Sequence, residues 1–168
     1  MKPFRRNRSI YMVFKKNFFN VWYRDVERGK FVYNRYFENL AAILLGYNPE
    51  SCNMNGICSM QYVFEADGSV YPCDFYMLDS YCIGNINTDS MITIDRNRER
   101  IGFIQQSAQL LETCTGCRWL RLCQGGCRRN RDENSGLNRF CSSYQEFFPY
   151  MLPRMEKLLR SLSLRTAP

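Results

Sequence analysis

Residues 114–141 read CTGCRWLRLCQGGCRRNRDENSGLNRFC and carry five of the nine cysteines of the chain. The spacing is Cys114-x2-Cys117-x5-Cys123-x3-Cys127-x13-Cys141, with glycines scattered between the cysteines. The segment has neither the 3.6-residue period of a helix nor the alternation of a strand. A segment with so little periodic structure does not hold its own shape, so we expect its cysteines to fasten it.

Three more cysteines lie upstream, spaced Cys52-x5-Cys58-x14-Cys73. Before the last of these cysteines, residues 61–65 alternate between apolar and polar, and residues 69–71 form a second short run on the far side of Asp67-Gly68. This pattern predicts a β-hairpin with a type I′ turn.

Helical periods flank the cysteine-rich region. Residues 10–26 predict a helix with one core-facing stripe, made of Ile10, Val13, Phe14, Phe18, Val21, Trp22 and Val26. Three more helices are predicted, over residues 34–45, about 96–111 and about 143–161. Pro149 and Pro153 predict a kink in the last. We expect an α+β fold: a helical connector at 1–50, a small cysteine-rich domain at 51–145, and a C-terminal helix and tail at 146–168.

The amino-acid composition excludes several kinds of catalytic and metal-binding site. The 168 residues include no histidine, which excludes catalytic triads, Cys-His nucleophiles, HExxH sites and Cys2His2 zinc fingers. Lys15 and Lys16 interrupt the first apolar run, which is too short for a signal peptide, and no run approaches the ~20 residues of a membrane span. We expect no membrane partner and a cytoplasmic location with reduced thiols. The cysteines are then metal ligands first, catalytic thiols second and disulfides third.

Two kinds of metal site compete for the cysteines. Eight cysteines in the two groups suffice for two four-thiolate sites, and Cys82 stands apart. Zinc favours a pair of CxxC knuckles, whereas this chain has one CxxC and otherwise irregular spacings. An iron–sulfur cluster is larger than a single ion and tolerates uneven spacing. The spacing therefore favours iron–sulfur clusters, with zinc as the alternative.

The cysteine pattern also carries a family resemblance. Cys58-x9-Gly68-x4-Cys73, followed by Cys114-x2-Cys117-x5-Cys123-x3-Cys127 and then Cys141, resembles the seven-cysteine SPASM motif of radical S-adenosylmethionine enzymes that modify peptides. The stretches CNMNGIC (52–58), DGSVYPCDF (67–75), IGNI (83–86) and CQGGCR (123–128) are similar to the C-terminal part of anaerobic sulfatase-maturating enzymes. Residues 22–23 and 35–37 resemble the connector that precedes SPASM in that family. The resemblance covers residues 13–157.

The resemblance implies a small SPASM domain with a β-hairpin and loops around two auxiliary [4Fe–4S] clusters. By the family pattern, the ligands of the first cluster are Cys52, Cys58, Cys73 and Cys127, and those of the second are Cys114, Cys117, Cys123 and Cys141. Cys127 would thus tie the hairpin to the C-terminal loop. Cys82 matches no ligand position, and we expect it to be a buried bystander.

Asp74 is the catalytic residue that the resemblance implies. In the family, the Asp after the hairpin cysteine is the base that takes a proton from the substrate Cys or Ser. The alternative is that Asp74 merely bonds nearby backbone N–H groups.

The radical-generating motif of that family, CxxxCxxC, is missing from this sequence, because Asn130 stands three positions after Cys127. S-adenosylmethionine is therefore expected only through a missing or separate domain, and whether the chain is itself an enzyme stays open. By resemblance it belongs to an oxidoreductase that converts a Cys or Ser of a sulfatase peptide to formylglycine. Three alternatives follow: a fragment inactive alone, a trans-acting half that docks on a separate radical S-adenosylmethionine barrel, or a stand-alone electron-transfer or zinc-binding module.

The net charge is +7, from 23 basic and 16 acidic residues, which invites a nucleic-acid interpretation. No recognisable nucleic-acid motif accompanies the arginines, so we expect no nucleic-acid partner. Eight thiolates would add about −8 and two [4Fe–4S]2+ cores about +4, which would leave the loaded domain near +3. The basic residues are then largely a counterpart to cluster charge.

Overall fold

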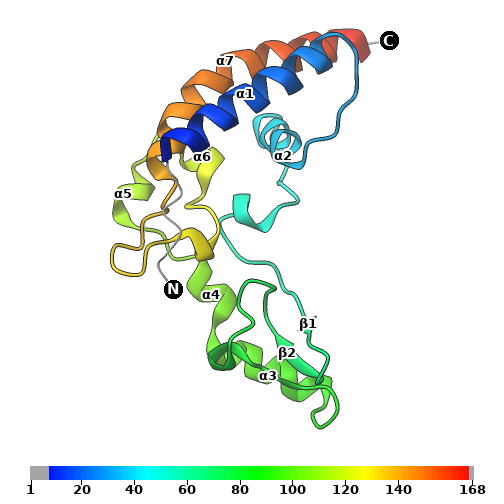
Figure 1. The fold of residues 1–168 in the computed structure, drawn as a ribbon, viewed down its shortest axis with the longest axis vertical. Helices are drawn as coiled ribbons and strands as arrows, with labels where there is room; N and C mark the ends of the chain where they lie inside the picture. The colour runs from blue at the N-terminus through cyan, green and yellow to red at the C-terminus, as the bar shows by residue number, and fades with distance from the viewer. Residues whose placement is uncertain (1–7, 167–168) are drawn as a thin grey trace.

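The computed structural model describes residues 8–166, with side chains placed for residues 11–162. The fold is α+β and has two parts (Figure 1). The first part, which we call the helical body, contains α1 (Arg8–Glu27), α2 (Arg35–Leu44), α6 (Leu120–Cys123) and α7 (Cys141–Thr166). The second part, the hairpin lobe, contains β1 (Val63–Phe64), β2 (Ser69–Tyr71), β3 (Gly84–Asn85), α3 (Met91–Ile101) and α4 (Phe103–Ser107).

The helical body has a large aromatic core. α1 and α7 run side by side, and α2 packs against both α6 and α7 (Figure 1). Phe19 is fully buried between them, with its ring centroid 5.3 Å from that of Phe37 and 5.9 Å from that of Phe147. The buried residues of this core are Met12, Phe19, Trp22, Phe37, Leu40, Ile43, Met54, Trp119, Leu122, Phe147, Phe148, Met151, Met155 and Leu158.

The stripe predicted for α1 is wrong at four of its seven positions, whereas Trp22 is buried and Val26 packs against the core as predicted. The side chain of Ile10 lies outside the described residues. Val13, Phe14, Phe18 and Val21 are exposed, while the buried face follows Met12, Lys15, Phe19 and Trp22. The helix has apolar residues on two faces, and α7 covers the face whose spacing runs i, i+3, i+7 and i+10. The other apolar face is left on the surface.

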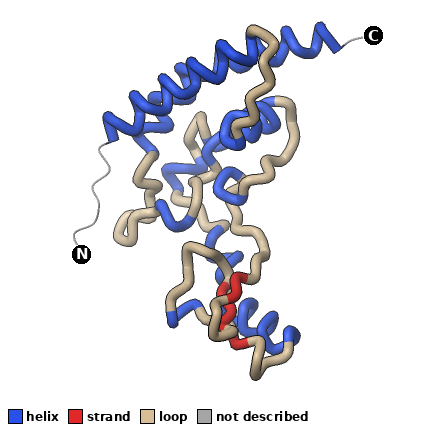
Figure 2. Tube along the Cα trace, turned by 45° about the vertical axis from the view of Figure 1, so that its right-hand side comes forward, coloured by secondary structure: helices blue, strands red, loops and turns tan. Residues whose placement is uncertain are grey.

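The hairpin lobe is a three-stranded antiparallel sheet in the order β1-β2-β3, packed on α3 (Figure 2). Val63 pairs with Tyr71, and Val70 pairs with Gly84. Its core is small: Val70, Ile83 and Ile94 are buried, with Tyr62 and Ile101 packed against them. The hairpin was predicted, whereas the two-residue strand β3 carries no sequence pattern that would reveal it.

The predicted type I′ turn is wrong. The Gly68 N–H donates to the Glu65 carbonyl at 3.0 Å, and the Glu65 N–H donates to the Ser69 carbonyl at 2.9 Å. Gly68 has a φ of 87°, while Asp67 keeps a negative φ and its Oδ1 accepts from the Ser69 N–H. The loop therefore has three residues and ends on a left-handed glycine, which also suits the twist of a hairpin.

The remaining segments refine the helix predictions. The predicted helix over 96–111 is broken at Gly102, whose φ of 61° separates α3 from α4. A separate short helix, α5 (Glu112–Thr115), follows. α7 begins at Cys141 and continues as one helix through both internal prolines to Thr166. Short 3-10 turns lie in three of the loops: η1 (Cys52–Met54) between α2 and β1, η2 (Asp79–Tyr81) between β2 and β3, and η3 (Arg128–Asn130) between α6 and α7.

Candidate metal sites

The four thiols of the second cysteine group, Cys114, Cys117, Cys123 and Cys141, line one cavity of 260 Å³. They come from α5, the loop after it, the end of α6 and the start of α7. Most of the other cavity walls are apolar, and they include Trp119, Tyr144 and Phe148 from the helical body. This group is therefore built onto the aromatic core.

Local contacts orient the sulfurs of the second group. The Trp119 N–H lies 3.5 Å from Cys117 Sγ, and Gln145 Nε2 donates to the same sulfur at 3.4 Å. Burial raises the pKa of Cys123 to about 11, and the thiolates of Cys141 and other group members add to that increase. Buried thiols that repel one another as thiolates are suited to a bound cation that relieves the repulsion.

The first cysteine group has a different setting. Cys52, Cys58 and Cys127 line a small cavity of 10 Å³ between the helical body and the hairpin lobe. Burial is the largest cause of the raised pKa of Cys127, and Cys58 and Cys52 contribute electrostatically. Burial also raises the pKa of Cys73 to about 11, with a contribution from Cys58. Cys58 is thus the common neighbour of Cys73 and Cys127.

All nine cysteines are free thiols. Within residues 8–166, no set of three or more cysteine, aspartate or glutamate side chains is arranged to hold a single metal ion. The grouping of the thiols rests instead on shared cavities and electrostatic coupling. Soft sulfur donors in sets of four fit iron–sulfur clusters and zinc in their chemistry. The role of the eight cysteines as ligands stays a prediction.

A left-handed loop separates Cys123 from Cys127. Gln124, Gly125 and Gly126 have φ values of 48°, 75° and 66°. A Cβ on Gly126 would collide with the amide of Asn138, whose Nδ2 donates to the Gly125 carbonyl at 3.0 Å. This reversal sends Cys127 away from the second group and toward the first.

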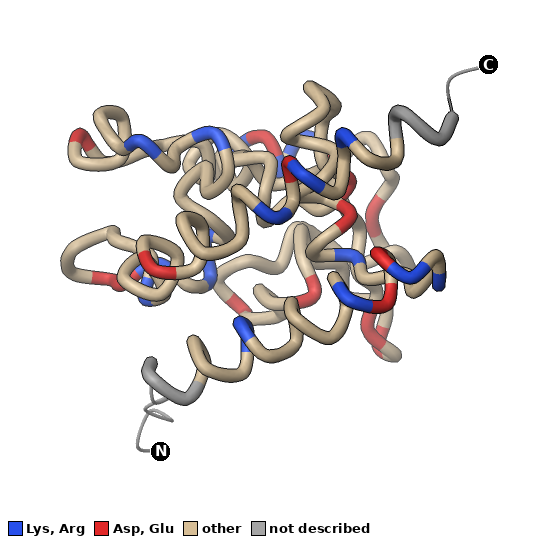
Figure 3. The backbone as a smooth tube through the Cα atoms, turned by 90° about the horizontal axis from the view of Figure 1, so that it is seen from above, with Lys and Arg blue, Asp and Glu red and all other residues tan. Residues whose placement is uncertain are grey.

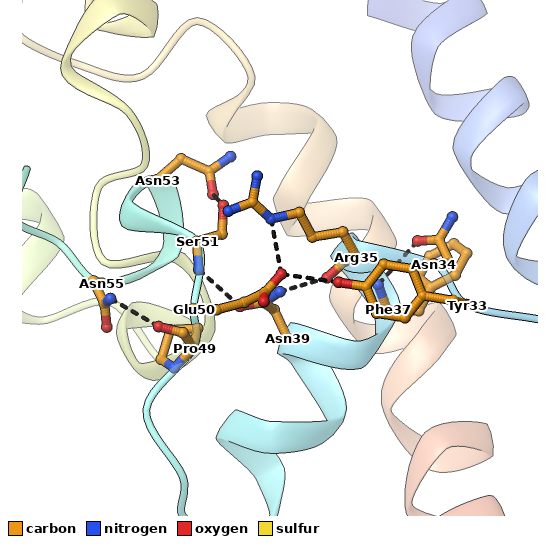
Figure 4. Close-up of polar contacts among 10 residues, drawn as sticks. All are labelled: Tyr33, Asn34, Arg35, Phe37, Asn39, Pro49, Glu50, Ser51, Asn53 and Asn55. Carbon is orange, nitrogen blue, oxygen red and sulfur yellow. Dashed lines mark hydrogen bonds and ion pairs between the residues drawn. The ribbon is translucent and has the colours of Figure 1, made fainter. Parts of the chain in front are cut away.

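Hydrogen bonds from α2 position the other end of the first group (Figure 4). Asn39 Oδ1 accepts from the Ser51 N–H at 3.0 Å, immediately before Cys52. Arg35 Nε donates to Glu50 Oε1 at 2.8 Å. Asn39 itself is buried in the helix. The helical body therefore fixes the segment that carries Cys52.

The hairpin lobe holds the remaining members of the first group. The Cys58 N–H donates to the buried Ser107 Oγ on α4 at 2.8 Å. The Arg128 guanidinium, next to Cys127, lies 5.0 Å from the Phe103 ring centroid and donates to Gln106 Oε1 at 2.9 Å. The first group is the junction of the two parts.

Asp74 is exposed beside the first group. The Cys73 thiol donates to Asp74 Oδ1 at 3.4 Å, and the Tyr76 N–H closes the turn on the Cys73 carbonyl at 2.9 Å. The hydrogen bond that the structure gives this carboxylate thus comes from the neighbouring thiol. The role of Asp74 as a base stays a prediction.

Cys82 was predicted to be buried, and that prediction is wrong. Cys82 is exposed, and its thiol donates to the Gly84 carbonyl at 3.5 Å. Its neighbour Ile83 is buried in the lobe core. Consecutive side chains of extended backbone point to opposite faces, so Cys82 faces outward.

Lys15 is a buried lysine that the sequence interpretation missed. Burial lowers its pKa to about 7, and the Cys123 thiolate opposes that decrease. Among the described residues, its Nζ has no hydrogen-bond partner. The signal was its position, three residues after Met12 and four before Phe19, on the stripe that turned out to be buried.

Charged residues elsewhere are mixed in sign, and Figure 3 shows basic and acidic positions interspersed over the molecule. A surface cavity of 640 Å³ collects four arginines, but Asp132 and Glu133 line it too. No helix in the described part of the chain has the length and apolar character needed to cross a membrane.

Comparison with known families matches residues 52–118 to the model for SPASM, an iron–sulfur cluster-binding domain. The matched range contains five of the eight thiols in the two groups and ends before Cys123, Cys127 and Cys141. These three thiols join the others through the cavities described above.

Curated relatives are anaerobic sulfatase-maturating enzymes. The cysteine-type enzyme of Clostridium perfringens (strain 13) is 45% identical over 149 residues, which are 86% of this chain and 40% of the relative. That of Clostridium novyi is 40% identical over 97% of this chain and 45% of the relative. The serine-type enzyme of Bacteroides thetaiotaomicron is 30% identical over 89% of this chain and 37% of the relative. The chain spans less than half the length of these relatives.

Solved structures agree with the sequence relatives. A structure of anSMEcpe with bound AdoMet and the Cp18Cys peptide superposes with a TM-score of 0.83 at 46% identity, over 92% of this chain and 44% of that one. A second, with the Kp18Cys peptide, gives a TM-score of 0.84 at 44% identity, over 96% of this chain and 47% of that one.

Proposed function

We propose that this chain carries the SPASM iron–sulfur cluster-binding domain of the anaerobic sulfatase-maturating enzymes. On that premise it binds two [4Fe–4S] clusters and acts as the auxiliary-cluster part of a sulfatase maturase. The observation that carries the proposal is the division of eight thiols into two coupled groups. We assign residues 51–145 to the domain, 1–50 to a helical connector, and 146–168 to a C-terminal helix and tail.

In this proposal each group holds one cluster. Cys52, Cys58, Cys73 and Cys127 would hold the first, and Cys114, Cys117, Cys123 and Cys141 the second. When bound, such clusters accept and donate single electrons. The protein contributes burial, which disfavours bare thiolates, and N–H donors such as the Gln145 amide, which bonds a ligand sulfur.

The reaction we propose is oxidation of a sulfatase Cys or Ser to formylglycine. AdoMet would bind outside this chain, in a radical S-adenosylmethionine domain fused to it or on a separate subunit. The identity of 45% to a cysteine-type enzyme, against 30% to a serine-type enzyme, favours a Cys substrate. Asp74 would take the proton from the substrate thiol, and its exposed position supports this role. Reduced free thiols favour a cytoplasmic location.

Anaerobic reconstitution tests the cluster proposal. We expect about eight irons and eight sulfides per chain, with Mössbauer spectra of two [4Fe–4S] clusters. Bound zinc with no sulfide would contradict the proposal and support the zinc-binding module. Four irons per chain would contradict the count of two.

A second candidate is a trans-acting half that docks on a separate radical S-adenosylmethionine barrel. It is favoured by the exposed apolar face of α1, where Val13 and Phe14 are 59% and 63% exposed. Co-expression with a barrel-only partner should then restore formylglycine formation on a sulfatase peptide. A partner that is inactive with this chain but active when fused to it would instead identify a fragment.

A further inference from the structure

Lys15 has surroundings unlike those of any other lysine whose side chain is described. Four aromatic rings enclose its ammonium, with centroid distances of 3.7 Å to Tyr36, 4.7 Å to Tyr144, 5.1 Å to Phe147 and 5.3 Å to Tyr11. Lys15 is 7% exposed, and its Nζ makes no hydrogen bond to any described residue.

The energy balance of this cage calls for an anion. Burying an unpaired ammonium costs several kcal/mol, even after the surroundings relax. Cation–π contacts return on the order of 2 kcal/mol when the cation is desolvated. The aromatic rings alone therefore do not keep the buried amine protonated, and its positive charge is retained only if an anion lies nearby.

The second cysteine group lies next to this cage. Tyr144 belongs to both places, because its ring faces the Lys15 ammonium and also lines the cavity of the four thiols. Cys123 is the acidic group to which Lys15 is electrostatically coupled. Cys123 also packs against the aromatic core that encloses the lysine.

We propose that Lys15 is the buried counter-charge of the second cluster and raises the reduction potential of that cluster. The inference rests on the proposed function, in which Cys114, Cys117, Cys123 and Cys141 hold the cluster. Four thiolates around a [4Fe–4S]2+ core carry a net charge of about −2, and one-electron reduction adds another negative charge. A fixed positive charge nearby, in a desolvated site, stabilises the reduced state more than the oxidised state.

Lys15 is a positioning charge and not a ligand. Its ammonium has no lone pair to offer a metal, and aromatic rings surround it. The neighbouring Lys16 provides a matched control, because it carries the same formal charge, is one third exposed, and pairs at the surface with Glu146 at 3.9 Å. Surface charges are screened and act weakly at a distance.

The test is a potentiometric titration of the reconstituted chain, followed by EPR. The variants are Lys15→Met, Lys15→Gln, Lys15→Arg and Lys16→Met, each checked for iron content. Of the two cluster couples, the one that is lost in a Cys141→Ala variant identifies the second cluster. Both neutral Lys15 variants should lower its equilibrium constant for reduction at least tenfold, which is 59 mV for one electron. Lys15→Arg and Lys16→Met should leave it nearly unchanged.

The outcomes separate this inference from the function on which it rests. Wild-type chain that holds no second cluster would overturn the proposed function, and the inference with it. Two clusters of normal iron content, with unchanged potentials in Lys15→Met and Lys15→Gln, would overturn the inference alone. An equal shift in Lys16→Met would also overturn it, since a general charge effect would then suffice.

Discussion

The two cysteine groups differ in what supports them. The second group lies on the helical body, in a 260 Å³ cavity walled by Trp119, Tyr144 and Phe148. Three thiols of the first group, Cys52, Cys58 and Cys127, line a 10 Å³ cavity where the helical body meets the hairpin lobe. The helical body has a large aromatic core of its own, whereas the core cluster of the lobe has three buried residues, and Phe103 of α4 is buried outside that cluster. The second group therefore lies on the large core of the helical body. The first group joins the small core of the hairpin lobe to that body.

The largest effect is expected when one thiol is removed from each group in turn. Cys127→Ala should lose the first cluster, about four of about eight irons, and release the hairpin lobe from its link. Cys141→Ala should lose a similar amount of iron yet leave the lobe folded. Hydrogen exchange at the Val70 and Ile83 amides of the lobe distinguishes the two variants. Cys82→Ala, at an exposed thiol, is the control and should change neither quantity.

Equal loss of lobe protection in both variants would break the comparison. The two groups would then support the chain as one unit.

A pair of core substitutions tests the two cores directly. Phe19→Ala should destabilise the helical body by about 3–5 kcal/mol, because the fully buried ring leaves a cavity. Ile94→Ala should destabilise the lobe and leave the helical body intact. Trp22 and Trp119 are the two tryptophans of the chain and both lie in the helical core, so their fluorescence reports that core alone. A large shift of the tryptophan transition in Ile94→Ala would indicate a single cooperative core.

Local chemistry predicted some of this arrangement and could not predict the rest. The limits of α2 follow from the Asn34 side chain, which accepts from the Phe37 N–H at 3.1 Å, and from Gly46 with a φ of 90°. Such caps involve residues only a few positions apart, so they can be predicted from the sequence. The buried face of α1 depends on where α7 packs. The sequence of α1 alone therefore does not show which of its two apolar faces is buried. Lys15 escaped notice for the same reason.

The thiol groups illustrate the same limit at longer range. Spacing gave the number of sites, and the family pattern gave the crossing of Cys127. The left-handed loop at residues 124–126 is the physical device for that crossing, and its two glycines were the visible part of it. Its third residue, Gln124, carries no sequence signal for a positive φ.

A smaller effect is expected in that loop. Gly126→Ala should cost about 1–3 kcal/mol, because its φ of 66° is strained for a side chain and the new methyl would collide with Asn138. Gly116→Ala is the matched control in the same cysteine-rich segment, since a Cβ there meets nothing within 4 Å. Iron content should fall at the first cluster in Gly126→Ala and stay full in Gly116→Ala. A full first cluster in both variants would show that the loop does not set the crossing.

The smallest expected effect concerns the segment before Cys52. Hydrogen bonds from Tyr33 and Arg35 lower the pKa of Glu50 below its ordinary value of 4.5. A lowered folded-state pKa contributes stability that is present above pH 4.5 and is lost as the pH falls through the folded value. An NMR titration of Glu50, with exchange of the Ser51 amide, should follow this loss. Glu50→Gln should remove the pH dependence; an unchanged profile would mean that this contact does not steady the first group.

The small cavity shared by Cys52, Cys58 and Cys127 also has a consequence for biosynthesis. Cys127 is far along the chain from Cys52 and Cys58, with the whole hairpin lobe between them. Lengthening such a span adds little to the cost of closing it, because the closure entropy grows only with the logarithm of length, but distant contacts form slowly. The lobe leaves the ribosome before Cys127 does. Until Cys127 is made, the small core of the lobe therefore lacks one of the thiols that join it to the helical body. Cys127 in turn precedes Cys141, and a nascent chain therefore completes the thiols at the junction before those on the helical body.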